Sequence, residues 1–245
     1  MIEQTRRTLQ DLKCSGMLKS LDIRLSEATS NGWGHIEFLS SLIQDEKMQR
    51  ETNKIKRRLK AAKFRVDACI EKIDTTAKRN ITKTQVQTLA QLQFIKQSKN
   101  VMLFGPTGVG KTYLASALGN HACRNGYSCI FIGMNMLIDR LAMSRTDGSY
   151  LRFRDKLITT DLLILDDLGI KPLPPQAIHD FYDLLEERYQ SKATIITSQL
   201  PFANWKEVIE DAVSLEAILD RLMHGSLIID LKGESYRKIR CKNEA

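Results

Sequence analysis

Eight consecutive residues have the types and spacing of a phosphate-binding loop. They match the pattern G-x-x-x-x-G-K-[ST] in full, and they are Gly105, Pro106, Thr107, Gly108, Val109, Gly110, Lys111 and Thr112. Glycines permit backbone conformations that point successive N–H groups inward at a helix N-terminus, where a polyphosphate binds. In such a loop Lys111 reaches the β- and γ-phosphates, and the Thr112 hydroxyl binds Mg²⁺. The motif therefore predicts a site for a nucleoside triphosphate, with Mg²⁺ as cofactor.

The residues on both sides of the loop support this interpretation. An apolar run at 101–104 precedes it and is typical of a buried strand, and residues 113–122 carry apolar side chains at helical spacing. The alternative is an ordinary glycine turn before a helix. Strand, complete motif and helix together favour the phosphate site.

A second apolar run ends in two acids, Asp166 and Asp167. At the carboxyl edge of a parallel sheet beside a phosphate loop, this is the Walker B arrangement. We expect Asp166 to hold Mg²⁺ and Asp167 to orient or deprotonate the attacking water. The alternative is a turn-forming pair of aspartates. A glutamate is commoner in the second position, and the shorter aspartate is consistent with slow or partner-dependent hydrolysis.

Two further polar side chains are candidates for catalysis. Gln199, with Thr197 as second choice, follows an apolar run and is expected at a strand tip between the acids and the phosphate loop. The alternative is turn polarity before Pro201. Arg221 closes a helix that begins near Ser214, and on its own it is only a cation at a helix C-terminus.

Strands and helices alternate from residue 100 onward, which predicts an α/β fold with a five-stranded parallel sheet between helices. The expected strands are 101–104, 128–132, 161–166, 193–197 and 227–230. Residues 1–66 have the pattern of helices only, and one more helix is expected at 84–96. We therefore expect a small helical N-terminal domain at 1–75, for DNA or partner contact and assembly, and an ATPase domain at 76–245.

The positive charge of the chain is concentrated in one expected helix. Nine basic residues and only two acidic ones lie between Glu46 and Arg65, which accounts for seven of the eight net positive charges. The alternative is a solvated helix face, but the cluster is dense enough to indicate contact with DNA phosphates. The candidate contacts are Lys54, Lys56, Arg57, Arg58, Lys60 and Lys63.

Composition argues against several other classes of protein. No apolar run is long enough for a membrane span, and the N-terminus has no apolar signal region. The five cysteines are scattered and form no C-x-x-C pair, which predicts reduced thiols in a cytoplasm and no zinc site.

The motifs together resemble the IstB-like transposition helper ATPases, AAA+ relatives of the replicative helicase loader DnaC. Besides the phosphate loop, the segments that carry the resemblance are LKCSGM at 12–17, LLILDDLG at 162–169, EERY at 186–189, TIITSQLP at 194–201, ILDRL at 218–222 and LKGESYR at 231–237. The resemblance runs over essentially the whole chain.

This resemblance implies a bacterial cytoplasmic ATPase that assembles on duplex DNA as a ring or helical homo-oligomer, deforms the DNA and helps a partner transposase. It implies ATP and Mg²⁺ as the cofactors, bound by Lys111 and Thr112. It also assigns Gln199 to sensor I and Arg221 to an arginine finger that acts on a neighbouring subunit's γ-phosphate. It also implies a DNA channel lined by the segment after the second strand. The basic residues of that segment are Lys156 and the candidate contacts Arg140, Arg145, Arg152 and Arg154.

One departure from general AAA+ architecture accompanies the resemblance. Only about a dozen residues follow the last expected strand, too few for a helical lid domain with its arginine sensor. The sequence does not indicate whether Arg237 replaces that sensor. The main alternative function is a DnaC-like helicase loader that binds single-stranded DNA and a helicase. A GTPase is disfavoured because no N-K-x-D motif follows the phosphate loop.

Overall fold

The structure, a computed structural model, describes residues 2–75 and 80–235 and divides into two compact units, Met1–Arg57 and Arg58–Ala245. The sequence placed a domain boundary near residue 75. The assignment of DNA or partner contact and assembly to the N-terminal domain stays a prediction.

The N-terminal segment is helical, as the sequence predicted. It forms α1 (Ile2–Asp11), α2 (Ser15–Asn31) and α3 (His35–Ala62). Gly32 ends α2 in the left-handed conformation, with φ of 62°, and its N–H donates to Ala28 O. Glycine adopts this conformation without the steric cost that a Cβ atom brings, so Gly32 stops the helix and redirects the chain.

The start of α2 packs closely on α3 at Gly16. A Cβ atom there would lie only 2.6 Å from Asp45 O and from Glu46 Cα. The buried Glu46 carboxylate accepts hydrogen bonds from the N–H groups of Gly16 (2.6 Å) and Met17 (3.2 Å), and from Arg50. Although burial opposes ionisation, these donors hold the pKa of Glu46 below its usual value. Glu46 therefore caps α2 from the neighbouring helix.

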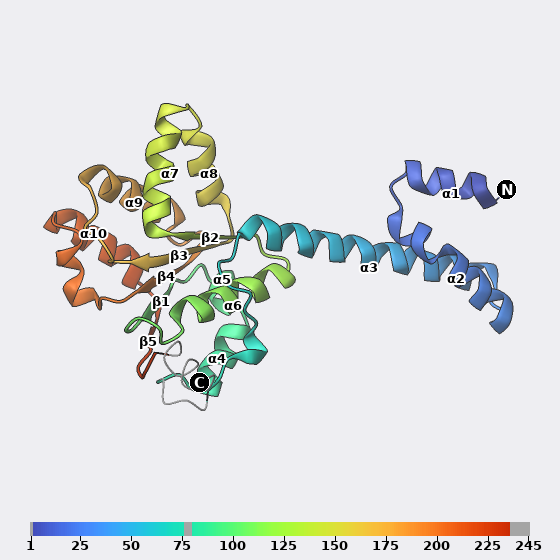
Figure 1. Ribbon diagram of the computed structural model, residues 1–245, viewed down its shortest axis with the longest axis horizontal. Coiled ribbons are helices and arrows are strands. Elements are labelled where there is room, and N and C mark those ends of the chain that lie inside the picture. Colours follow the sequence, from blue (N-terminus) through green and yellow to red (C-terminus); the bar gives the residue numbers. More distant parts are fainter. Residues whose placement is uncertain (1, 76–79, 236–245) are drawn as a thin grey trace, which may run out of the picture. The chain divides into compact units, whose positions relative to one another are not determined.

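The second unit is built on a parallel sheet of five strands in the order β2-β3-β4-β1-β5, which confirms the predicted fold class (Figure 1). All four strand pairs are parallel. The strands are β1 (Val101–Phe104), β2 (Cys129–Gly133), β3 (Leu162–Leu168), β4 (Ala193–Ser198) and β5 (Leu227–Asp230).

Helices cover both faces of this sheet. One face carries α4 (Lys83–Ala90), α5 (Gln93–Lys96) and α6 (Lys111–Arg124), whereas the other packs against α7 (Met134–Thr146), α8 (Tyr150–Thr159), α9 (Pro175–Arg188) and α10 (Ala212–Met223). Two short 3₁₀ helices, η1 (Ile70–Lys72) and η2 (Phe202–Glu207), complete the unit. The helix predicted at 84–96 is two helices, because Leu92 adopts the left-handed conformation with φ of 55°.

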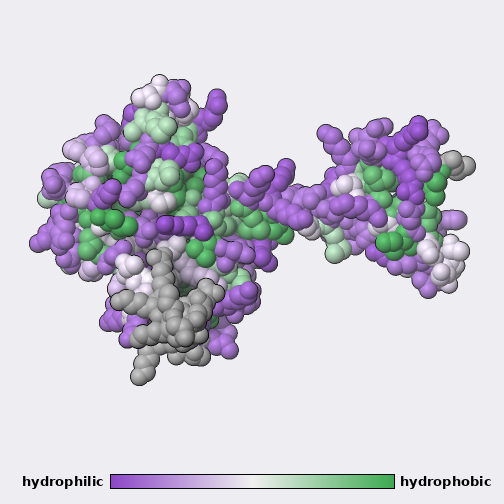
Figure 2. Space-filling model, in the orientation of Figure 1, coloured by the Kyte–Doolittle hydropathy of each residue, from purple (hydrophilic) through white to green (hydrophobic). Residues whose placement is uncertain are grey.

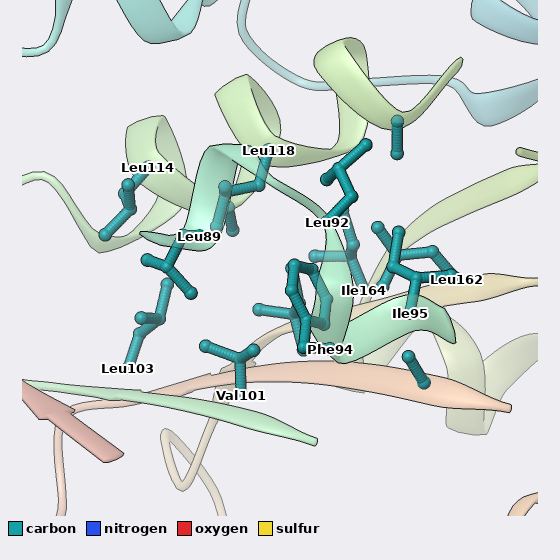
Figure 3. Close-up of a cluster of buried hydrophobic side chains, with 14 of the residues drawn as sticks. Leu89, Leu92, Phe94, Ile95, Val101, Leu103, Leu114, Leu118, Leu162 and Ile164 are labelled. Atoms are coloured by element: carbon teal, nitrogen blue, oxygen red, sulfur yellow. The ribbon is translucent and has the colours of Figure 1, made fainter. Parts of the chain in front are cut away.

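Alternate residues of each strand face opposite sides of the sheet, as the two-residue period requires. On the α6 side, Leu103 and Ile164 pack with Leu114 and Leu118 of α6 (Figure 3). Close packing also occurs at Gly119, where a Cβ atom would lie 2.5 Å from the Phe64 ring. The segment that follows α3 is thereby anchored to the ATPase sheet.

The Arg188 side chain links several backbone segments near the start of β4. Its side chain is buried, and its Nη1 donates to the carbonyls of Leu157 (2.7 Å) and Thr160 (2.8 Å). Its Nη2 donates to Ala193 O, and its Nε donates to the Thr194 hydroxyl at 3.1 Å. Burial lowers the pKa of Arg188 to about 9, which still leaves it protonated at neutral pH. One guanidinium thus joins the end of α8 to the start of β4.

We expect Arg188→Leu to lower the free energy of unfolding by about 3 kcal/mol or more, because several buried carbonyls lose their donor. For a chain of this size, the melting temperature should fall by roughly 6–12 °C. Arg154→Leu is the control, since Arg154 makes a partly exposed ion pair with Glu187 at 2.8 Å. Its loss should lower the free energy of unfolding by less than about 1 kcal/mol. Equal melting shifts in the two variants, measured by calorimetry, would contradict this role.

Candidate nucleotide-binding site

The phosphate loop joins β1 to α6 at the carboxyl edge of the sheet. Gly105, Gly108 and Gly110 have φ of 137°, 87° and 102°, a region that side chains other than glycine rarely adopt. Gly110 directly precedes α6, so the loop lies at the N-terminal end of a 14-residue helix. Backbone N–H groups and the helix dipole favour an anion at such a position.

The Lys111 side chain is folded back onto its own loop. Its Nζ donates to Gly105 O at 2.7 Å and to Pro106 O at 2.9 Å. Burial lowers the pKa of Lys111, whereas the charges of Asp167 and Asp166 act in the opposite direction. The ammonium group therefore lies where its donors can exchange backbone carbonyls for phosphate oxygens.

Asp166 is fully buried at the end of β3 and is held by two hydroxyl groups. Thr112 donates to its Oδ1 and Oδ2 at 3.0 and 3.2 Å, and Thr197 donates to Oδ1 at 2.7 Å. Burial raises the pKa of Asp166, and the hydrogen bond from Thr197 opposes that rise. Carboxylate and hydroxyl oxygens are the ligands that Mg²⁺ prefers, so this donor set fits the ion.

Asp167 turns away from the regular strand, with φ of 61°. The register of β3 with β4 breaks between Leu165 and Leu168 around it. Its backbone N–H donates to the Thr197 hydroxyl at 2.9 Å, so one hydroxyl links both acids. Because of this turn, Asp167 faces the cavity above the loop.

That cavity has a volume of about 710 Å³, within the range of small-molecule sites. The described residues that line it come mainly from the phosphate loop, from the segment between α3 and α4, and from Asp167 of the acid pair, whereas Asp166 lies behind the wall. They include Arg65, Val66, Lys72, Ile73, Asp74, Ile81, Asp167, Ile170, Gln199 and Leu231. Gln199, the first-choice catalytic candidate at the end of β4, is an exposed residue in the cavity wall. Thr197, the second choice, makes the direct contact with Asp166.

Arg65 is a member of this site that the sequence did not assign to it. Its Nη1 lies 3.4 Å from Asp167 Oδ2 and 4.0 Å from Asp166 Oδ2. The sequence shows Arg65 only as the last cation of a basic run, more than one hundred residues before the acids. Only the fold brings these groups together.

The chain after β5 packs against the phosphate loop. A Cβ atom at Gly105 would lie 2.1 Å from Leu231 O, and one at Gly108 would lie 2.1 Å from Ser235 Oγ. These two glycines are therefore needed for close approach as well as for backbone conformation. Arg237 lies outside the described residues.

Arg221 on α10 does not belong to the described lining of this cavity. Its Nε donates to Glu186 on α9, its Nη1 donates to Asp220 at 2.6 Å, and its guanidinium lies 5.3 Å from the Tyr189 ring centroid. The hydrogen bond to Glu186 raises the pKa of Arg221, so the side chain is a permanent cation.

The basic candidates on and just beyond α3 are mostly exposed. Lys54 pairs with Glu51 at 2.9 Å, Arg58 is half-buried, and the remainder are the exposed residues Lys56, Arg57, Lys60 and Lys63. Figure 2 shows hydrophilic residues along the middle of α3. Lys63 follows the helix in the left-handed conformation, with φ of 57°.

The arginines of α7 and α8 differ in their contacts. These two helices lie side by side (Figure 1). Arg145 makes an ion pair with the buried Asp180, Arg154 pairs with Glu187, and Arg140 lies 4.6 Å from the centroid of the Phe153 ring. Arg152 is exposed, and no ion pair is found for it within residues 2–75 and 80–235. Arg152 and Arg140 are thus more open to a ligand than Arg145.

None of the helices in the described part of the chain is both long and apolar enough to cross a membrane. Solved structures share the fold of the second unit. DnaI is 22% identical, with a TM-score of 0.59 over 72% of this chain and 94% of its own. The DnaC helicase loader is 21% identical, with a TM-score of 0.55 over 67% of this chain and 97% of its own. The fold is therefore that of AAA+ P-loop proteins.

Sequence relatives extend over both units. A protein named as an insertion sequence ATP-binding protein (y4pL) of Sinorhizobium fredii is 40% identical over 94% of each chain. A protein named as the IS21 ATP-binding protein of Pseudomonas aeruginosa is 36% identical over 94% of this chain and 86% of its own. The family model described as IstB-like ATP binding protein matches residues 7–245. The chain therefore belongs to the IstB-like ATP-binding protein family.

Proposed function

We propose that this protein is an ATP-dependent helper of DNA transposition, which assembles on duplex DNA, deforms it and acts with the transposase of the same mobile element. As a member of the IstB-like family it is an ATPase. The observation that carries the proposal is that hydrogen bonds link Thr112, Asp166 and Asp167, in part through the Thr197 hydroxyl, beside the cavity that Lys111 lines. Relatives named for insertion sequences support the link to transposition.

The residues of the site have separate roles in this proposal. The loop N–H groups and Lys111 bind the β- and γ-phosphates, and Thr112 and Asp166 hold Mg²⁺. The ion neutralises phosphate charge when it is bound. Asp167 orients the attacking water, and its backbone is fixed by Thr197. Gln199 senses the γ-phosphate from the cavity wall.

Arg221 acts on a neighbouring subunit in this proposal. It lies outside the described lining of its own cavity, and a partly exposed cation on α10 suits a contact in trans. Glu186 and Asp220 hold it until that contact forms. The site is then complete only in an oligomer, so ATP hydrolysis depends on assembly.

DNA contact is assigned to the basic residues of the α3 region and to the exposed arginines of α7 and α8. Lysine and arginine side chains of this kind bind phosphates and position a duplex without reading its bases. The bacterial origin of the relatives and the absence of a membrane-spanning helix within the described residues support a bacterial cytoplasmic location.

A competition experiment separates this function from helicase loading. The proposed helper should bind a labelled duplex in the presence of ATP and release it only slowly to unlabelled single strands of equal length. A preference for single strands, together with binding to a replicative helicase, would instead identify a loader.

Duplex affinity should fall steeply with salt, because each phosphate contact releases condensed counterions. The double variant Lys56→Ala, Lys60→Ala should reduce the slope of log K against log salt concentration by roughly two. The matched control is Lys171→Ala, Lys206→Ala, which removes two exposed lysines outside the basic cluster. A salt slope that is unchanged in the first variant, or equally reduced in the control, would remove the α3 region from the DNA interface.

Arg221→Ala should retain ATP binding and lose turnover by about 10³-fold, because its charge is needed in the transition state. Lys111→Ala should fail to bind ATP. If Arg221 acts in trans, mixed oligomers of the two variants combine an intact loop with an intact arginine, and ATPase activity should partly return. An absence of rescue at every mixing ratio would argue for a role within one subunit.

A further inference from the structure

Arg65 has no part in the roles assigned so far, yet it faces the nucleotide cavity. Its backbone is fixed by Phe64, whose ring lies edge-on to Phe131 at 6.3 Å and occupies the space left by Gly119. The Arg65 side chain itself is 66% exposed. A fixed backbone with an exposed guanidinium allows the side chain to change partner without any change in the fold.

The ion pair that Arg65 makes with Asp167 is weak. The contact of Nη1 with Asp167 Oδ2 is 3.4 Å, whereas charge-assisted hydrogen bonds are usually 2.7–2.9 Å. An exposed ion pair of this length contributes little to stability. Asp166 lies further away, at 4.0 Å. The guanidinium is therefore available to a stronger anion at the same place.

The charges around the cavity predict which anion that is. Among the described residues, three cations balance three acids in the cavity wall and directly behind it: Arg65, Lys72 and Lys111 against Asp74, Asp166 and Asp167. A triphosphate keeps roughly two negative charges after one Mg²⁺ has bound, so the loaded site becomes negative. If Arg65 moved away, this negative charge would be left unbalanced. If Arg65 stays, its guanidinium offsets part of the charge.

We propose that Arg65 leaves Asp167 when nucleotide binds and contacts the phosphates, which makes it a phosphate-binding residue that acts within its own subunit. Guanidinium groups suit this role because their donors match phosphate oxygens in pairs. Arg65 now lies beside the acid pair, so its contact is with the γ-phosphate end. The side chain therefore favours ATP over ADP. The inference concerns the nucleotide site alone and does not depend on DNA binding.

The test is the affinity of Arg65→Ala for fluorescent ATP and ADP analogues, titrated with Mg²⁺ and without DNA. We expect about tenfold weaker binding of the ATP analogue, and less than about threefold weaker binding of the ADP analogue. Arg65→Lys should lie between, because it keeps the charge and loses the paired donors. Lys206→Ala is the matched control, since it removes one exposed cation that does not line the cavity, and it should bind both analogues normally.

Two results would overturn the proposal. Unchanged or tighter ATP binding by Arg65→Ala would show that Arg65 only occupies the space beside Asp166 and Asp167 and does not bind the phosphates. Equal losses for ATP and ADP, with a melting temperature lowered in the absence of nucleotide, would show a structural role. The proposal requires the nucleotide-free melting temperature to stay within about 2 °C of the native protein.

Discussion

The arrangement of the nucleotide site depends on one buried carboxylate. Asp166 has no exposed surface and is held by hydroxyls from α6 and β4, so three elements meet at its two oxygens. A buried charge is costly unless it is paired, and burial raises the pKa of Asp166 accordingly. The arrangement favours any cation that approaches from the cavity. In the structure that cation is Arg65, and Mg²⁺ is suited to the same oxygens.

The two acids of the site, Asp166 and Asp167, are placed for different roles. Thr197 donates to Asp166 and accepts from the N–H of Asp167, so one hydroxyl links the acid that we propose for Mg²⁺ to the acid that we propose for water. The left-handed turn at Asp167 directs its side chain into the cavity, whereas Asp166 stays behind it. The roles that we propose for the two acids, metal binding and water activation, thus belong to consecutive residues that face different surroundings.

The sequence predicted the sheet, the loop and the acids because each has a local pattern: apolar runs of strand length, glycines at fixed spacing, and acids at a strand end. It did not predict the break at Leu92, whose left-handed conformation depends on packing rather than on residue type. Nor did it assign Arg65 to the site, since the contact with Asp167 spans 102 residues. The sequence also did not predict the ion pair of Arg145 with the buried Asp180, because a basic stretch does not show which of its residues are paired with an acid.

The most direct test of the account is the size and shape of the complex on long duplex DNA, imaged by electron microscopy with ATP or with ADP. The account predicts closed or helical assemblies that bend the DNA in ATP, and their loss in ADP, because only the triphosphate completes the site between subunits. Single subunits scattered along straight DNA in ATP, or identical assemblies in both nucleotides, would contradict it.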